Sequence, residues 1–204
     1  WRVYLLVLAC MIMACGNARA GTTSVPVQGH WRFRLLPGAT TTHPKAAQWH
    51  RGHVPGTVQT DLLANGLIDK PYYRDNEAKL QWIGLADWQY RTTFRVDAAM
   101  LQHDHVDLVF DGLDTFADVS LNGHQVLAAD NMFRSWRVPA KALLHAGNNT
   151  LTVTLHSPIA RLQPWLQKQP YALPGEFDSA FGDEPKGKQT ANYVRKAAYQ
   201  YGWD

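Results

Sequence analysis

The side chains that could do chemistry in this sequence are few and lie far apart. His50 and His53 are three residues apart and could offer two imidazoles to a metal ion, but no third ligand recurs nearby. Both cysteines, Cys10 and Cys15, lie close to the N-terminus, so the rest of the chain offers no thiolate ligand. We therefore interpret the two histidines as hydrogen-bonding residues of a loop and expect no metal site.

Carboxylates could support hydrolysis of a glycosidic bond, which needs a pair about 5–5.5 Å apart for retention or about 6.5–9.5 Å apart for inversion. The dipeptide Asn76-Glu77 is one candidate, because an Asn-Glu pair carries the acid/base in many sugar hydrolases built on a barrel. Here it is expected to lie in a charged loop before the strand that begins at Trp88, with no run of parallel strands and helices around it, so we interpret it as structural or as lining a rim. Ser120 and Ser135 lack the strand-turn-helix setting of a nucleophile, which gives a serine hydrolase no support.

Composition narrows the classes of partner. The formal net charge is only +3 and the basic residues are scattered, whereas a nucleic-acid partner calls for a basic stripe. The chain has eight Trp, against about two expected at ordinary usage. Indole rings on a β scaffold can stack on sugar rings, although core packing is the alternative for any single Trp. Composition therefore allows a sugar partner and excludes a nucleic acid.

The N-terminal residues have the features of an export signal. Arg2 precedes an apolar run over residues 3–14, and Ala18-Arg19-Ala20 supplies the small residues of a cleavage site. The run is shorter than the about 20 residues that span a bilayer. We expect a signal peptide over residues 1–20, a domain over residues 21–204 without a membrane span, and a periplasmic or extracellular location. Acylation of Cys15, as in a lipoprotein, is the alternative that the Ala-Arg-Ala site disfavours.

The elements that must position any site are mostly strands. Apolar and polar residues alternate over residues 106–110, 117–121 and 151–155, which is the period of half-buried strands. Asn122-Gly123 predicts a type I′ hairpin turn, because both residues tolerate positive φ angles. We expect these three strands to form one antiparallel sheet.

Further elements flank this central region. A strand is predicted over residues 88–96 and another near residues 30–35, while residues 58–67 predict a short helix capped by Thr57 or Thr60. Phe133 and Trp136 are expected to pack on the sheet. Residues 158–204 are rich in proline at their start and predict a mostly irregular segment.

Short, regularly spaced strands with long aromatic connections predict an all-β fold, a jelly-roll β-sandwich with one or two short helices. An immunoglobulin-like sandwich is the nearest alternative, but the Cys–Trp–Cys pattern is absent.

Several long motifs resemble one family. FDGLDTFADVSLNGHQVLAADNMFRSWRV and GNNTLTVTLHSP resemble the N-terminal, galactose-binding-domain-like jelly roll of glycoside hydrolase family 2. VPGTVQTDLLANGLIDKPYYRDNEAKLQWIGLADWQYRTTF and the final YVRKAAYQYGWD are similar to its β-mannosidase branch. The exo-β-glucosaminidases share much of this scaffold and are the alternative branch.

The resemblance implies a multidomain, retaining exo-hydrolase that removes terminal β-mannose from glycans and needs no cofactor. Its catalytic Glu pair would lie on a barrel beyond Asp204, so no catalytic residue is expected in this chain. Residues 158–204 would reach toward that barrel, and Trp203 and Asp204 would contact the terminal sugar. The expected partners are a β-mannoside oligosaccharide and the downstream domains of the same chain. A carbohydrate-binding β-sandwich without catalysis is the alternative from another functional class.

Overall fold

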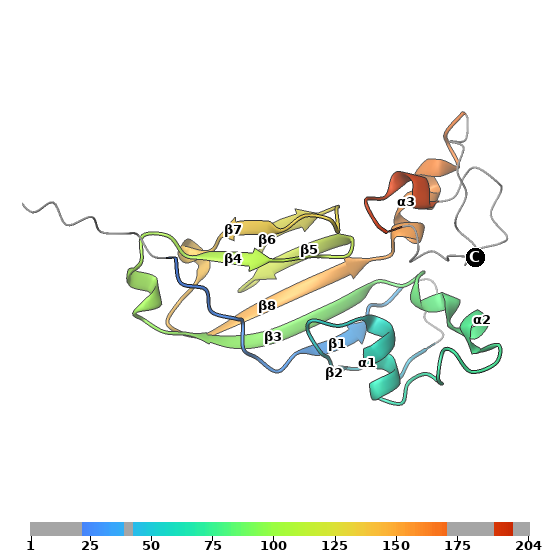
Figure 1. The fold of residues 1–204 in the computed structure, drawn as a ribbon, viewed down its shortest axis with the longest axis horizontal. Helices are drawn as coiled ribbons and strands as arrows, with labels where there is room; N and C mark the ends of the chain where they lie inside the picture. Colours follow the sequence, from blue (N-terminus) through green and yellow to red (C-terminus); the bar gives the residue numbers. More distant parts are fainter. Residues whose placement is uncertain (1–21, 39–42, 171–189, 198–204) are drawn as a thin grey trace, which may run out of the picture.

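The computed structural model describes residues 22–38, 43–170 and 190–197, and their strands form two layers (Figure 1). Sheet A has six strands in the order β2-β1-β3-β8-β5-β6, and sheet B pairs β4 with β7; every pairing of neighbours is antiparallel. The strands of sheet A are β1 (Arg32–Leu35), β2 (His50–Arg51), β3 (Trp88–Val96), β5 (Phe116–Leu121), β6 (His124–Ala129) and β8 (Gly147–His156). Those of sheet B are β4 (Asp107–Phe110) and β7 (Trp136–Pro139). This architecture confirms the prediction of an all-β jelly-roll sandwich.

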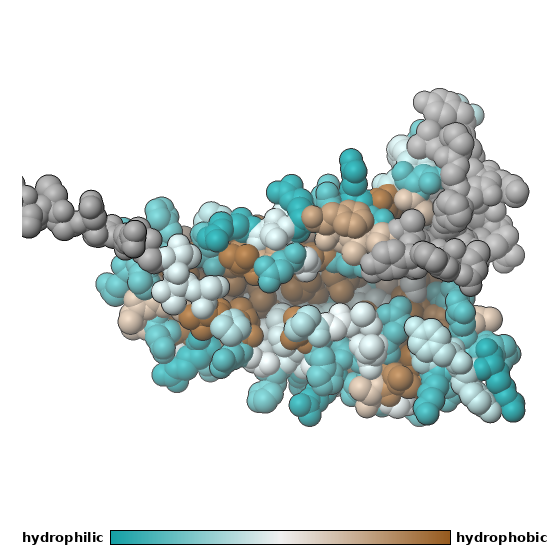
Figure 2. Space-filling model, in the orientation of Figure 1, coloured by the Kyte–Doolittle hydropathy of each residue, from teal (hydrophilic) through white to brown (hydrophobic). Residues whose placement is uncertain are grey.

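The core lies on the inner face of sheet A. Along β3 the buried positions alternate with exposed ones, as the sequence predicts for Trp88, Tyr90, Thr92 and Phe94. Phe33 and Val119 are completely buried, and burial of such a side chain stabilises the fold by about 1.5–3 kcal/mol. Hydrophobic side chains gather in a band between the two layers in Figure 2, with hydrophilic ones around it.

The turn between β5 and β6 has the predicted geometry, because Asn122 has a φ of 51° and Gly123 a φ of 86°. Both are the positive angles that the Asn-Gly dipeptide tolerates. The three central strands, however, do not form one sheet. β5 and β8 are neighbours in sheet A, whereas β4 belongs to sheet B, where Leu108 pairs with Val138. Alternation identifies β4 as a half-buried strand but cannot tell which of two facing layers it joins.

Within the part of the chain that the structure describes, three α-helices and several 3₁₀ turns flank the sandwich. They are α1 (Val58–Ala64), α2 (Asn76–Leu80), α3 (Pro158–Leu166), η1 (Gln81–Ile83), η2 (Met100–Gln102), η3 (Lys141–Leu143) and η5 (Thr190–Tyr193). Helix α1 confirms the predicted helix, and both candidate caps contribute, since Thr57 and Thr60 form a capping box.

Helix α1 is fixed to sheet A by a buried carboxylate. Asp61 is completely buried and accepts hydrogen bonds from the hydroxyl of Tyr90, at 2.9 Å, and from the backbone N–H of His53, at 3.1 Å. Burial, followed by the charge of Asp61 and the hydrogen bond to it, raises the pKa of Tyr90 far above its usual value. The raised pKa keeps the phenol protonated at neutral pH, so that it donates to Asp61.

Helix α3 is a feature that the sequence analysis missed, because residues 158–166 were expected to be irregular. Pro158 occupies the first turn, where a missing N–H costs nothing, and the hydroxyl of Ser157 caps the helix by accepting the N–H of Ala160 at 3.1 Å. Pro164 lies inside the helix, and a proline at such a position argues against a helix when only the sequence is considered. The expectation for Phe133 was wrong, since its side chain is 66% exposed, whereas Trp136 does pack against the core.

Candidate functional site

One end of sheet A carries a cluster of charged side chains. There β3 and β5 begin and β8 ends, and α3 and α2 lie at the same end of the molecule (Figure 1). Asp87 immediately precedes β3, Asp118 lies on β5, and His156 is the last residue of β8. We call these three residues the His156 cluster.

The imidazole of His156 bridges the two carboxylates. Its Nδ1 lies 2.8 Å from Oδ2 of Asp87, and its Nε2 lies 2.9 Å from Oδ2 of Asp118. Burial disfavours the charged ring, but the hydrogen bonds and charges of Asp87 and Asp118 outweigh it and raise the pKa of His156. A protonated imidazole donates from both nitrogens, which is what two carboxylate acceptors require.

The same cluster fixes the start of α3. Oδ1 of Asp87 accepts the N–H of Ser157 at 2.8 Å, and the hydroxyl of Ser157 donates to the carbonyl of Gly84 at 2.6 Å. Ser157 is 97% buried, so these bonds are shielded from water. The direction in which α3 leaves the sheet is therefore set by the segment before β3.

A pocket of about 350 Å³ opens beside the cluster and is lined by Asp87, His156, Ala160 and Arg161. The guanidinium of Arg161 lies 5.0 Å from the centre of the Phe116 ring. The guanidinium of Arg161 can donate hydrogen bonds to hydroxyl or carboxylate groups in this pocket, whereas both ring nitrogens of His156 are already bonded to Asp87 and Asp118. Asp87 and Asp118 are both bonded to one imidazole, however, which leaves them poorly suited to act as the acid and the nucleophile of a glycosidase.

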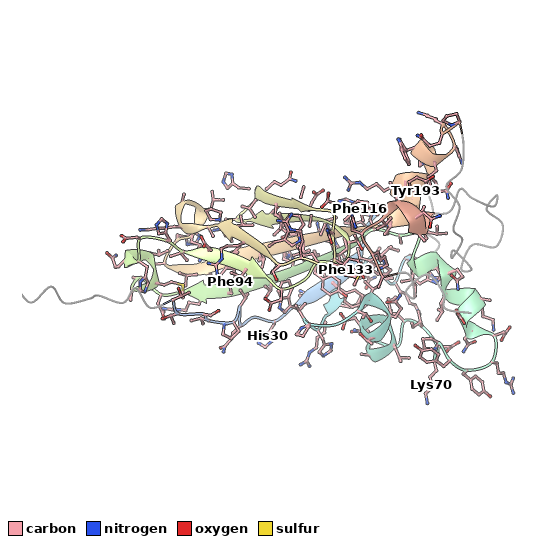
Figure 3. All side chains as sticks on the ribbon, turned by 45° about the horizontal axis from the view of Figure 1, so that its top comes forward. His30, Lys70, Phe94, Phe116, Phe133 and Tyr193 are labelled. Carbon is pink, nitrogen blue, oxygen red and sulfur yellow. The ribbon has the colours of Figure 1, made fainter. Side chains whose placement is uncertain are left out.

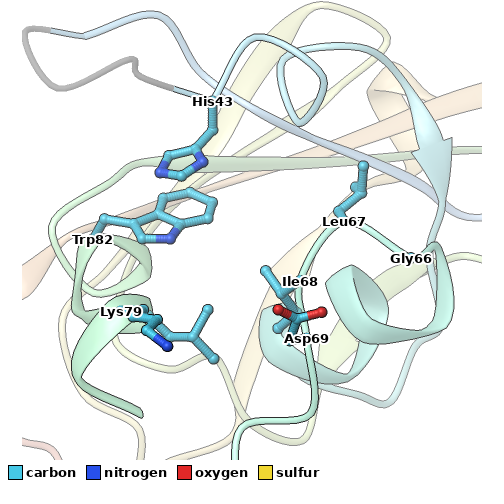
Figure 4. A pocket seen from close by; sticks show the side chains of 8 residues that line it. His43, Gly66, Leu67, Ile68, Asp69, Lys79 and Trp82 are labelled. Atoms are coloured by element: carbon cyan, nitrogen blue, oxygen red, sulfur yellow. The ribbon is translucent and has the colours of Figure 1, made fainter. Parts of the chain in front are cut away.

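A second, smaller pocket of about 230 Å³ lies between the segment after α1 and the helices α2 and η1 (Figure 4). The ring of His43 stacks on Trp82 with the centroids 3.7 Å apart, and Asp69 and Lys79 also line this pocket. Because His43 covers one face of the indole, that face is not free to stack on a sugar.

The two histidines that could offer imidazoles to a metal ion are engaged in hydrogen bonds. His50 and His53 act as hydrogen-bonding residues: Nε2 of His50 lies 2.8 Å from the carbonyl of Lys45, and Nδ1 of His53 lies 2.8 Å from Oδ1 of Asp61. His50, however, belongs to strand β2 and not to a loop. Within residues 22–38, 43–170 and 190–197, no group of three His, Cys, Asp or Glu could hold a metal ion.

Asn76-Glu77 lies in helix α2 and not in a loop. Asn76 is 91% buried and its side-chain amide donates to the carbonyl of Lys70 at 3.0 Å, while Glu77 is exposed. Asn76 therefore has a structural role, because its side chain fixes the segment before α2. Trp203 and Asp204, the predicted sugar contacts, lie outside the described residues.

Sequence reasoning missed the His156 cluster. The alternation of β8 places His156 on the same outward face as Thr152 and Thr154, so its orientation was available from the pattern. Its partners were not, because Asp87 and Asp118 are 69 and 38 residues away along the chain.

Among the described residues, no helix is long and apolar enough to cross a membrane.

Comparison with known proteins gives a consistent result. A family model described as glycosyl hydrolase 2 galactose-binding domain-like matches residues 31–204. β-Mannosidase B of Thermothelomyces thermophilus is 34% identical over 180 residues, which are 88% of this chain and 19% of that protein. The β-mannosidase of Capra hircus is 30% identical over 202 residues, or 98% of this chain and 22% of that protein. The chain thus spans about a fifth of the length of these relatives.

Two solved structures bear on the fold. The β-D-mannosidase of Dictyoglomus thermophilum superposes with a TM-score of 0.73 at 36% identity, over 86% of this chain and 20% of that one. An exo-chitosanase of Amycolatopsis orientalis superposes with a TM-score of 0.53 at 23% identity, over 66% of this chain and 17% of that one. The second likeness shows the fold alone.

Proposed function

Because the chain belongs to the glycosyl hydrolase 2 galactose-binding domain-like family, we propose that it is the N-terminal domain of an exo-acting, retaining β-mannosidase. The observation that carries this proposal is the likeness to the Dictyoglomus β-D-mannosidase, which extends over most of the chain in both sequence and structure. The substrate would be a glycan or oligosaccharide with β-D-mannose at its non-reducing end.

In this proposal the domain braces the catalytic domain and completes the sugar site, and the catalytic Glu pair lies in another part of the protein. The 204-residue chain alone would therefore be inactive. Asp87 and Asp118 are both bonded to the imidazole of His156, so neither carboxylate is left free for catalysis. This supports the placement of catalysis in another part of the protein. The retaining mechanism runs on carboxylates alone and needs no cofactor.

Trp203 and Asp204 are the residues that we propose to touch the sugar, as the family resemblance implies. A carboxylate can accept hydrogen bonds from two sugar hydroxyls, and an indole can stack against one face of the sugar ring. Asp204→Ala in the full-length protein should lower kcat/KM for 4-nitrophenyl β-D-mannoside by 10- to 100-fold, which is about 1.4–2.8 kcal/mol of transition-state stabilisation.

Asp104→Ala is the matched control, because Asp104 is exposed after η2 and should leave kcat/KM unchanged. If Asp204→Ala behaves like Asp104→Ala, the domain only braces the catalytic domain. Proton NMR of the first anomer released tests the retaining mechanism, which requires β-mannose to appear before its α form.

Two alternatives make different predictions in the same assay. An exo-β-glucosaminidase would cleave 4-nitrophenyl β-D-glucosaminide in preference to the mannoside. A binding domain without catalysis would cleave neither compound, and mannose or mannobiose would give heat on titration.

We further propose export to the periplasm or the extracellular space, on the strength of the apolar run and the Ala18-Arg19-Ala20 site. Intact-mass measurement of the secreted protein should place the mature N-terminus at Gly21. A diacylated species that starts at Cys15 would identify a lipoprotein instead, and an uncleaved N-terminus would contradict export by this signal.

A further inference from the structure

The outer face of sheet A, opposite to the core, carries exposed arginines on three adjacent strands. Alternation along β3 directs Phe94 into the sandwich, as Figure 3 shows, and Arg91 to the outer face. Arg32 of β1 is paired with Arg91 of β3 on one side and with Arg51 of β2 on the other. Because directly paired residues point to the same face, the three side chains leave the sheet in one row. We call Arg51, Arg32 and Arg91 the arginine row.

The arginine row concentrates positive charge that the fold does not neutralise. Neighbouring strands lie about 4.7–4.9 Å apart, so the row spans about 10 Å across β2, β1 and β3 (Figure 1). Like charges at directly opposite positions destabilise a sheet. In the ranges that the structure describes, the ion pairs join other side chains, and none includes a member of the row. An anion bound along the row would therefore relieve an unfavourable arrangement.

Neutral groups hold the guanidiniums around one indole. Arg32 donates to the backbone carbonyl of Trp49 at 3.1 Å. The guanidinium carbons of Arg91 and Arg34 lie 4.3 and 4.5 Å from the centre of the Trp49 ring. Arg34 also donates to the side-chain oxygen of Gln89 through two of its nitrogens. These partners restrict the arginines and leave their charge uncompensated, and a guanidinium that lies over a ring can still donate from its edge to an oxyanion.

Neutral polar side chains extend the row across the rest of sheet A. Arg91 is paired with Thr152 of β8, Thr152 with Ser120 of β5, and Ser120 with Gln125 of β6. Thr152 is four residues before His156, so the row crosses the sheet near the end that carries the His156 cluster. A linear ligand along this line would meet cations over three strands and hydroxyl or amide groups over the next three. Hydroxyls and amides both donate and accept hydrogen bonds, as sugar hydroxyls require.

We propose that the outer face of sheet A binds an anionic glycan. Its carboxylate or sulfate groups lie on the arginine row, where a guanidinium can hold an oxyanion through two parallel hydrogen bonds. Its hydroxyl groups lie on Thr152 and Ser120. The choice of a glycan over another polyanion rests on the proposed function, whereas the attraction of an anion rests on the row itself.

Calorimetric titration of the full-length protein with hexagalacturonate, sulfated maltohexaose and neutral maltohexaose tests this site. At least one anionic sugar should bind about 10-fold or more tightly than maltohexaose, and the tighter of the two identifies the recognised group. Binding no tighter than that of maltohexaose by both overturns the proposal. None of these α-linked sugars is a substrate of a β-mannosidase, so the result is the same whether or not the protein cleaves mannosides and the proposed function holds.

Hexaglutamate and hexathymidylate test whether the ligand is a glycan. Both carry a comparable number of negative charges on another scaffold, without sugar hydroxyls placed for Thr152 and Ser120. Each should bind about 10-fold more weakly than the better anionic sugar, because these hydrogen bonds are lost. Equal or tighter binding of either compound overturns the assignment to a glycan.

Variants of the arginine row locate the binding. Arg91→Gln and Arg51→Gln should each weaken binding of the anionic sugar about 10-fold, because a charge-assisted contact is lost. Arg91→Lys keeps the charge but loses the planar fork, and should weaken binding about 5-fold. Arg95→Gln is the matched control, since Arg95 is exposed on the same face of β3, is paired with Asn148 outside the row and should leave the Kd unchanged. An equal loss in Arg95→Gln, or a parent-like Kd in Arg91→Lys, would mean attraction by net charge alone and would overturn the site.

Discussion

The two ends of the sandwich are built from different chemistry. At the end where β5 turns into β6 and β8 begins, buried neutral amides fix the chain. Nδ2 of Asn122 donates to Oδ1 of Asn149 at 2.8 Å, and Asn149 is 99% buried. At the other end, the His156 cluster, Arg161 and the Asp114–Lys196 ion pair are charged and partly exposed.

This difference leads us to expect that one end serves stability and that the other is available to a partner. Every polar atom of the Asn149 side chain is satisfied internally, so this side chain has no free group with which to recognise another molecule. Half-exposed charges keep part of their hydration and can exchange water for a ligand or another domain. We therefore expect the functional contacts of the domain at the charged end, and we expect variants at the two ends to separate stability from activity.

The largest expected effect is at the neutral end. Asn149→Ala removes four hydrogen bonds, two accepted from Asn122 and His145 and two donated to the carbonyls of His145 and Gly147. The free energy of unfolding should fall by about 3 kcal/mol, because several buried groups lose their partner at once. Urea denaturation measures this loss.

Asn148→Ala is the matched control, since Asn148 is the exposed neighbour and should change stability by less than about 0.5 kcal/mol. Under conditions in which Asn149→Ala is still folded, its kcat/KM in the full-length protein should equal that of the parent. A lower kcat/KM of the folded Asn149→Ala variant would show that this end also contributes to activity, and would contradict the difference drawn between the two ends.

A moderate effect that depends on pH is expected for His156→Gln. Because the folded protein raises the pKa of His156, the protonated ring stabilises the fold fully below its unfolded pKa of about 6.5. This contribution is lost as the pH rises through the folded pKa. The difference in Tm between parent and variant should thus be largest near pH 6, where it reflects about 1 kcal/mol, and should shrink toward pH 9.

Paired thermal melts from pH 6 to pH 9 measure this trend. His124→Gln, at an exposed position of β6, should show no such dependence on pH. A difference that grows with pH would mean that the neutral ring, and not the imidazolium, holds the two carboxylates.

A smaller effect is expected for Arg161→Ala. The guanidinium lies over Phe116 at an exposed position, and a contact of this kind is worth about 0.5–1 kcal/mol. Chemical denaturation should detect this loss. A much larger one would indicate that Arg161 is an integral part of the fold and not a residue available to a partner.

The smallest effect is expected for Glu77→Gln. Glu77 is exposed on α2, so its substitution should change stability by less than about 0.5 kcal/mol and kcat/KM less than twofold. Steady-state kinetics of the full-length protein checks this. A fall of 100-fold or more would make Glu77 a catalytic residue and contradict the placement of catalysis outside this domain.

Local features of the fold were predictable from the sequence, and contacts between distant segments were not. The turn at Asn122-Gly123 and the cap at Thr57 follow from the backbone preferences of a few adjacent residues. The membership of β4 in sheet B depends on how two layers face each other, which no local pattern encodes. Prolines hid α3, although Pro158 is compatible with a first helical turn.

The candidate site was less predictable than the fold. The orientation of His156 follows from the alternation of β8, but its raised pKa depends on Asp87 and Asp118, which only the folded sheet brings together. The Asp114–Lys196 pair joins residues 82 positions apart and has no sequence motif. The sugar contacts at Trp203 and Asp204 stay predictions from the family resemblance.

The most direct test of the account is the substrate preference of the full-length protein. We would measure kcat/KM for 4-nitrophenyl β-D-mannoside and for 4-nitrophenyl β-D-glucosaminide under the same conditions. The account predicts hydrolysis of the mannoside with a kcat/KM at least 100-fold above that of the glucosaminide. A preference for the glucosaminide, or no hydrolysis of the mannoside, would contradict it.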